Sequence, residues 1–212
     1  PLSHQMLGVV YAARKDFVAA RAAFAKALEL NPTYLPAIAN LARLDIAEKK
    51  PADARKRFEA VIAKDPKNEQ ALLALADVMA RTGAPPPEIV ATLQGAFTAN
   101  PHSVAARLAL IGFHLRVQDF KAALSAAQDA AATLRTEPRI IGALAQAQEA
   151  AGETNQAIET WNRLAALEPR STVPLVRLAA LFARQKDYAK AIDSLRRAQK
   201  LSPGDPAITR DL

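Results

Sequence analysis

Prolines recur along this 212-residue chain at a nearly constant interval. Successive members of the series lie 34, 35, 68 and 34 residues apart, and each follows a helix-forming run: Pro32, Pro66, Pro101, Pro169 and Pro203. A fixed period of this length indicates that one small structural unit is repeated and that the units stack on their neighbours. The period predicts a single array over 1–212, with six repeats and the start of a next helix: 1–34, 35–68, 69–103, 104–137, 138–171, 172–205 and 206–212.

The composition favours helices throughout this array. Alanine supplies 49 residues, whereas glycine supplies 7 and the aromatic residues together supply 11. Alanine has the highest helix propensity, and β-sandwiches and barrels need many β-branched and aromatic residues instead. The fold class is therefore expected to be all-α. No apolar run approaches the roughly 18 residues that a membrane-spanning helix needs.

The first repeat carries a recognisable pattern of large and small side chains. Its members are Leu7, Gly8, Tyr11, Ala20, Phe24, Ala27 and Pro32. This pattern resembles the tetratricopeptide repeat (TPR), with His4 in place of the motif's tryptophan, and the later repeats follow it. The resemblance implies a right-handed superhelical solenoid of helix-turn-helix repeats, in which small residues let the two helices of a repeat cross closely.

Repeats 3 and 4 depart from this pattern. Repeat 3 has one extra residue, which we place in its inter-helix loop, residues 82–88, where three prolines are expected to stiffen the chain and exclude helix. We interpret this segment as a rigid loop, and a proline-rich ligand for an aromatic groove is the alternative. Repeat 4 has Ile111 at a position for a small residue, Ala127 at a position for a large one, and Arg135 in place of the proline.

Residues that carry most enzyme chemistry are scarce. The chain has no cysteine and three histidines, His4, His102 and His114, which do not share one helical face. No motif of a metalloprotease, a dinucleotide site or a serine hydrolase occurs. His114 and Trp161 both occupy packing positions of their repeats. We therefore expect no enzyme activity, no cofactor and no metal site within these residues.

The TPR resemblance also implies where a partner binds. The first helices of a TPR array line its concave face, and six positions of each first helix face this groove. These positions include the residues of the predicted partner-binding groove: Asn40, Arg43, Asp77, Arg81, Arg116, Arg139, Gln146, Arg177 and Arg184, with Glu149 beside them as a second carboxylate. Six arginines without a lysine favour bidentate contacts with carboxylates or phosphates.

The expected partner is therefore an extended segment of another protein or peptide, acidic in character. The formal net charge of +7 agrees with such a partner, and an anionic polysaccharide is the alternative. The densest basic run, residues 49–57, contains no aromatic residue that could stack on a base, so nucleic acid is not expected. The lysine and asparagine pattern of TPR proteins that bind chaperone tails is absent as well.

Three short stretches carry a narrower resemblance. Residues 80–85, 113–116 and 152–157 read Ala-Arg-Thr-Gly-Ala-Pro, Phe-His-Leu-Arg and Gly-Glu-Thr-Asn-Gln-Ala. They resemble segments of the TPR lipoproteins that accompany the bacterial PEP-CTERM/exosortase system and its exopolysaccharide genes. That resemblance implies a fragment of a longer protein, located in the periplasm or anchored at the outer membrane; without it, we expect the cytoplasm. Two other roles stay open: a substrate-recruitment arm of a larger enzyme, and a structural spacer.

Overall fold

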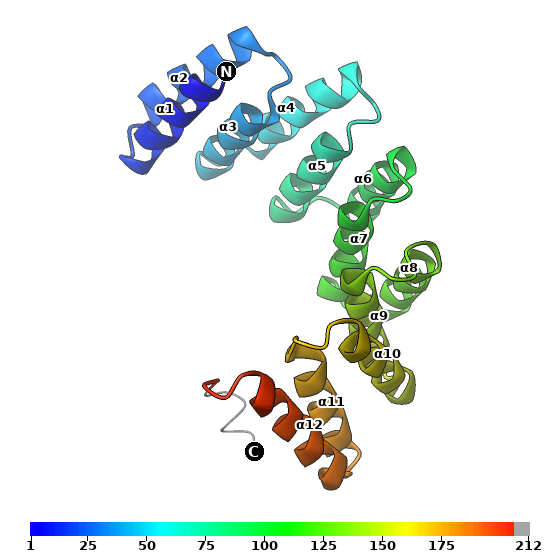
Figure 1. Ribbon diagram of the computed structural model, residues 1–212. Helices are drawn as coiled ribbons and strands as arrows, with labels where there is room; N and C mark the ends of the chain where they lie inside the picture. Colours follow the sequence, from blue (N-terminus) through cyan, green and yellow to red (C-terminus); the bar gives the residue numbers. More distant parts are fainter. Residues whose placement is uncertain (206–212) are drawn as a thin grey trace. The chain divides into compact units, whose positions relative to one another are not determined.

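The computed structural model describes residues 1–205, and every regular element in this part of the chain is an α-helix (Figure 1). The helices are α1 (Leu2–Ala13), α2 (Phe17–Leu30), α3 (Leu35–Ala47), α4 (Pro51–Lys64), α5 (Glu69–Arg81), α6 (Pro86–Ala99), α7 (Val104–Arg116), α8 (Phe120–Thr133), α9 (Pro138–Ala150), α10 (Thr154–Leu167), α11 (Val173–Arg184) and α12 (Tyr188–Leu201). Each predicted repeat contains one consecutive pair, so the all-α helical-repeat fold is confirmed. The further helix predicted over 206–212 lies outside the described residues.

The chain divides into two compact units, residues 1–106 and 107–212, with the boundary inside α7. In unit 1, the second helix of one pair packs on the first helix of the next, as α2 does on α3 and α4 on α5. In unit 2, α8 packs on α9 and α10 on α11 in the same way. Each unit therefore builds its own core by stacking helix pairs.

The turn inside each pair has one recurring geometry. In the first pair, the N–H of Asp16 donates to the carbonyl of Tyr11, and the N–H of Lys15 donates to the carbonyl of Ala12, both at 3.0 Å. These two bonds form a Schellman ending, which needs a left-handed backbone at Lys15 (φ 62°). The equivalent residues of the other pairs also have positive φ: Lys49, Gly83, Gln118, Gly152 and Lys186. The first helix therefore ends at the same point in every repeat.

Aspartates begin three of the second helices. The carboxylates of Asp16, Asp119 and Asp187 each accept a hydrogen bond from the backbone N–H three residues further on. The side chain and the backbone N–H of Lys190 both donate to Asp187, and these hydrogen bonds lower the pKa of that carboxyl. The stability that this cap contributes is present above the ordinary aspartate pKa and is lost as the pH falls through the lowered pKa.

The recurrent prolines lie in the turns between pairs. Each second helix ends two residues before the proline position. In the first such turn, the N–H of Tyr34 donates to the carbonyl of Asn31 at 3.1 Å, which leaves Pro32 as the second of four turn residues, where its fixed φ is favourable. In repeat 4, Arg135 occupies this place, and the turn still closes from Glu137 to Leu134 at 3.2 Å. The proline favours this turn without being required for it.

The connection inside repeat 3 differs from its prediction. α5 ends at Arg81 and α6 begins at Pro86, which leaves four connecting residues against three in the other pairs and confirms the inserted residue. The expectation that all three prolines exclude helix is wrong, because Pro86 and Pro87 form the first turn of α6. Residues in the first turn donate no intrahelical hydrogen bond, and the fixed φ of proline suits that position.

A small and a large residue meet where the helices of a pair cross. A Cβ on Gly8 would lie 2.5 Å from the ring of Phe24, so the glycine is needed for the close approach. The equivalents in other pairs are buried: Ala42 with Phe58, and Ala145 with Trp161. Repeat 4 reverses the sizes, and its Ile111 and Ala127 are both buried too. The reversal keeps the total side-chain volume of the pair similar.

First helices are covered by the second helix of the preceding pair. Leu41 and Leu44 of α3 are buried in one cluster with Phe24 and Ala27 of α2. At the same repeat positions of α1, Leu7 and Val10 are exposed. Stacking between pairs, rather than the folding of one pair alone, therefore buries this face of the first helices.

A buried carboxylate connects three helices of unit 1. Asp45 of α3 lies 2.8 Å from Arg21 Nη2 of α2 and 2.5 Å from Arg57 Nε of α4. Arg21 also pairs with Glu48, which accepts a hydrogen bond from Lys50. The hydrogen bonds from Lys50 and Arg21 lower the pKa of Glu48. This cluster was not predicted from the sequence, because Asp45 occupies a repeat position that usually holds a packing residue.

Candidate functional site

An apolar hollow of about 300 Å³ lies at the N-terminal ends of α9 and α11 in unit 2. We call it the apolar hollow, and its lining residues are Leu108, Pro138, Arg139, Gly142, Ala143, Gln146, Trp161, Leu164, Glu168, Ser171 and Val173. Gly142 contributes no side chain, and a Cβ there would lie at an ordinary contact distance, 3.5 Å, from Leu164 Cδ2. The hollow is therefore open in part because residue 142 is glycine.

A second hollow adjoins it toward the C-terminal ends of the same two helices. This arginine hollow has a volume of about 310 Å³ and is lined by Gln146, Glu149, Ala150, Arg177 and Arg184. Gln146 lines both hollows. Arg177 and Arg184 are seven residues apart, so they lie on one face of α11 two turns from each other.

Four of the nine predicted groove residues line these hollows: Arg139, Gln146, Arg177 and Arg184. Arg177 Nη1 lies 3.9 Å from Glu149 Oε2, and Arg184 makes no ion pair within the described part of the chain. Arg139 Nε lies 2.8 Å from Glu137 Oε1. Glu137 was not predicted from the sequence, because it belongs to the preceding repeat and comes close to Arg139 only through the turn before α9.

The core of unit 2 fixes one carboxylate of the arginine hollow. Trp161 is 1% exposed, which confirms its predicted packing role. Its indole N–H donates to Glu149 Oε1, so the same side chain also reaches the site. This contact was not predicted from the sequence. A polar partner for residue 161 could have been predicted from its being tryptophan, because a buried indole N–H needs a hydrogen-bond acceptor. The phenylalanines at the equivalent positions need none.

Two other residues singled out in unit 2 lie on α7. Arg116 is exposed, and its guanidinium carbon lies 5.9 Å from the centre of the Phe113 ring. It lines neither hollow. His114 is partly buried, with its ring edge-to-face against Phe113 and its Nδ1 3.9 Å from Asp119 Oδ2. This environment agrees with the predicted packing role of His114.

The predicted groove residues of unit 1 contact one another within their own helices. Arg43 Nη1 donates to Asn40 Oδ1 at 3.2 Å, and Arg81 Nε lies 2.9 Å from Asp77 Oδ2. Such exposed pairs are individually weak, but they reduce the free positive charge. The sequence count of six arginines against two carboxylates therefore overstates the charge excess, because it leaves out pairing between neighbours and the carboxylate of Glu137.

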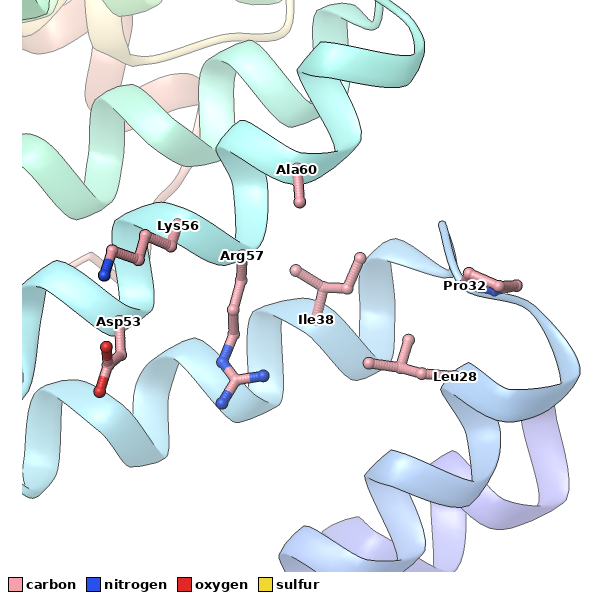
Figure 2. A pocket seen from close by; sticks show the side chains of 7 residues that line it. All are labelled: Leu28, Pro32, Ile38, Asp53, Lys56, Arg57 and Ala60. Atoms are coloured by element: carbon pink, nitrogen blue, oxygen red, sulfur yellow. The ribbon is translucent and has the colours of Figure 1, made fainter.

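Unit 1 has a hollow of its own, of about 400 Å³, among α2, α3 and α4 (Figure 2). Its lining residues are Leu28, Pro32, Ile38, Asp53, Lys56, Arg57 and Ala60, none of which belongs to the predicted groove. Figure 2 shows Arg57 extended from α4 toward α3, where it pairs with Asp45. The guanidinium of Arg57 is therefore engaged, which leaves Lys56 beside Asp53 as the remaining charged lining.

Metal-binding clusters and membrane spans are both absent from residues 1–205. No group of three or more His, Asp or Glu side chains is arranged to hold a metal ion there. No helix in the same range combines the length and the apolar character that crossing a bilayer requires.

Comparison with protein families decides the family of this chain. Residues 11–57 and 45–87 match one model of the tetratricopeptide repeat, and residues 143–206 match another. Together these matches cover more than half of the chain and reach into both units. The chain belongs to the tetratricopeptide-repeat family. The TPR fold supports a role as a protein-interaction scaffold.

Solved TPR structures share this fold at low sequence identity. The MamA fragment from Desulfovibrio magneticus RS-1 aligns with a TM-score of 0.64 and 15% identity, over 83% of this chain and 98% of that one. YrrB, described as a TPR protein with an unusual peptide-binding site, aligns with a TM-score of 0.61 and 16% identity, over 88% and 96%. A thermophilic TPR protein from Thermus thermophilus, TTC0263, aligns with a TM-score of 0.56 and 21% identity, over 86% and 98%. These likenesses concern the fold alone.

One curated relative also matches part of this TPR chain. The human protein O-mannosyl-transferase TMTC1 is 29% identical over 93 residues, which make up 44% of this chain. The match spans 10% of the length of the human protein.

Proposed function

We propose that unit 2 of this TPR protein binds an extended segment of a partner protein along the seam between α9 and α11. The observation that carries this proposal is the pair of adjoining hollows on these helices, which four of the predicted groove residues line. An apolar hollow beside a polar one suits a peptide, because one short segment can carry both an apolar and a charged side chain.

The arginine hollow favours an acidic segment. Arg184 has no ion pair within residues 1–205, and the one ion pair of Arg177, with Glu149, is long at 3.9 Å. A carboxylate that enters the hollow could accept paired hydrogen bonds from a guanidinium, which fits carboxylate geometry. An anionic polysaccharide would meet the same arginines, but it has no apolar side chain to place in the apolar hollow.

The proposed contribution of these residues is binding rather than catalysis. The alternative role is that of a recruitment arm whose catalytic domain lies in the rest of a larger polypeptide. The match of 93 residues to a small part of a human O-mannosyl-transferase supports this alternative, since that protein's name denotes an enzyme. The sequence of the full-length gene product distinguishes the two roles, because only the recruitment arm requires a catalytic domain.

The narrower setting is also a proposal. Residues 80–85, 113–116 and 152–157 support a place in a bacterial PEP-CTERM and exopolysaccharide export or assembly system, with a periplasmic or outer-membrane location. Exosortase and polysaccharide genes beside the gene for this protein, together with a lipoprotein signal in its full-length product, are the expected findings. A neighbourhood without these genes would contradict this setting and leave the binding role intact.

Selection from a random library of displayed twelve-residue peptides tests the binding role. We expect the enriched peptides to carry net negative charge and to lose roughly tenfold in affinity for the Arg177→Ala/Arg184→Ala variant, since two exposed ion pairs contribute up to about 1 kcal/mol each. The matched control is Arg196→Ala/Lys200→Ala, which removes the same charge from exposed residues of α12 that line neither hollow.

The control variant should keep nearly the full affinity of the unaltered protein. Equal losses in the two variants would mean that charge acts as a diffuse field. A selection without enriched peptides would reject peptide binding by this protein.

A further inference from the structure

The two hollows of unit 2 are arranged in a fixed order along α9 and α11. On α9, the apolar hollow takes Gly142 and Ala143, and the arginine hollow takes Glu149 and Ala150, seven residues later. On α11, Val173 lines the first hollow, and Arg177 and Arg184 line the second. At a rise of 1.5 Å per residue, the two hollows are about 10 Å apart along α9. On α11, Arg177 and Arg184 lie about 6 and 16 Å beyond Val173, so the midpoint of the two arginines has a similar separation from it. The separation between the two hollows is therefore similar along α9 and along α11.

The walls also restrict the backbone of whatever lies between them. α9 and α11 are helices, whose backbone N–H and C=O groups bond within the helix, so they offer no strand edge to pair with. The backbone N–H and C=O groups of a bound segment must therefore form their hydrogen bonds with water or with side chains. Polyproline II is the extended conformation that does so, with about 3.1 Å of rise per residue and three residues per turn. In that conformation, residues three apart point the same way and are about 9 Å apart.

Gln146 occupies the place where such a backbone would pass. It lines both hollows and is exposed. The NH₂ group of its amide can donate a hydrogen bond to a backbone C=O, and its carbonyl oxygen can accept one from a backbone N–H. It can therefore contact a segment that runs in either chain direction.

The two hollows differ in what they can accept. Most of the apolar hollow is built from apolar side chains and Gly142. Its polar lining consists of Arg139, which is paired with Glu137, and of Gln146, Glu168 and Ser171 at the edge of the hollow. In the arginine hollow, two guanidinium groups face one carboxylate, that of Glu149, which Trp161 holds in place. The first hollow suits a large apolar side chain, and the second suits a carboxylate.

We propose that unit 2 selects partner segments with one large apolar residue and one aspartate or glutamate three positions apart, held in a polyproline II conformation. This inference rests on the proposed peptide binding and specifies which residues of the partner, at which spacing, the site recognises. The apolar side chain enters beside Gly142, and the carboxylate lies between Arg177 and Arg184.

Labelled peptides of identical composition test this spacing rule. The probes place Leu and Glu in a Pro/Ala host at separations of two, three and five residues, in both orders, and their affinities are measured by fluorescence anisotropy. One of the two probes with a separation of three should bind about tenfold more tightly than its isomers, because only this spacing fills both hollows. Equal affinities at all three separations would overturn the proposal.

Variants of the protein assign each probe residue to its hollow. In Gly142→Leu, the added side chain occupies the apolar hollow, so changing the Leu of the probe to Ala should alter affinity less than about twofold, against about tenfold in the unaltered protein. In Arg177→Ala/Arg184→Ala, changing the Glu of the probe to Gln should likewise alter the affinity less than about twofold. Gly142→Ala is the folding control, because its Cβ meets Leu164 at an ordinary distance.

The outcomes separate the spacing rule from the proposed function. If displayed peptides need Arg177 and Arg184 but the Leu/Glu probes bind without regard to spacing, the rule is wrong and peptide binding stands. If neither displayed peptides nor probes bind, both fail. If the Glu of the probe stops contributing to affinity in Gly142→Leu, and the Leu stops contributing in Arg177→Ala/Arg184→Ala, the two side chains occupy the opposite hollows. The rule as stated is then rejected.

Discussion

Replacing Trp161 with alanine is expected to lower the free energy of unfolding by about 3–5 kcal/mol. The side chain is 1% exposed and lies in one cluster with Ile141, Leu164 and Leu178, so the change removes a large buried surface and leaves a cavity. It also removes the indole donor of Glu149, whose carboxylate is then oriented by Arg177 alone. The measurement is urea denaturation followed by circular dichroism, because the substitution removes the only tryptophan.

The matched control is Leu167→Ala on the same helix. Leu167 is 43% exposed, so its truncation should lower the free energy of unfolding by less than about 1 kcal/mol. Similar losses for the two variants would show that Trp161 is not the centre of the core of unit 2.

The reversed pair of repeat 4 predicts a strong coupling between two substitutions. Ile111→Ala should lower the free energy of unfolding by about 2–5 kcal/mol, because it leaves a small residue opposite another small residue, Ala127. Ala127→Phe alone should destabilise by about 1–3 kcal/mol through overpacking against Ile111. The double variant restores the small-with-large arrangement of Gly8 with Phe24, so it should be more stable than the sum of the two losses predicts.

A double-mutant cycle by chemical denaturation measures this coupling. Neighbouring core residues that share one space typically couple by about 0.5–3 kcal/mol. Additive losses would mean that Ile111 and Ala127 do not meet across the helix crossing, and that repeat 4 is packed differently from the other repeats.

The proline period and the order of small and large residues were sufficient to predict the helix pairs. They succeed because each feature corresponds to a local requirement: a turn that favours proline after Asn31, and a crossing that admits only glycine opposite Phe24. The start of α6 was not predicted, because a run of prolines is compatible with both a loop and a first helical turn. Only the packing of the pair selects between them.

The candidate site could be predicted only in part. Repeat positions assign Gln146, Arg177 and Arg184 to the groove face of their helices, and these three side chains line one hollow. The pairing of Arg139 with Glu137 and the bond from Trp161 to Glu149 depend on side-chain directions in three dimensions. A position-by-position count treats each residue as independent, so it finds the arginines and the carboxylates of Asp77 and Glu149, but it finds neither Glu137 nor the contacts that these side chains make.

The indole N–H resonance of Trp161 gives the most direct test of the proposed binding seam. The chain has one tryptophan, so the ¹H–¹⁵N spectrum contains a single indole signal, from a side chain that lines the apolar hollow and donates to Glu149 in the arginine hollow. During titration with a peptide recovered from the display selection, this signal should shift in proportion to saturation, and in Arg177→Ala/Arg184→Ala the midpoint of the titration should move to a roughly tenfold higher peptide concentration. A peptide that saturates the unaltered protein while the indole signal does not move would contradict binding at α9 and α11.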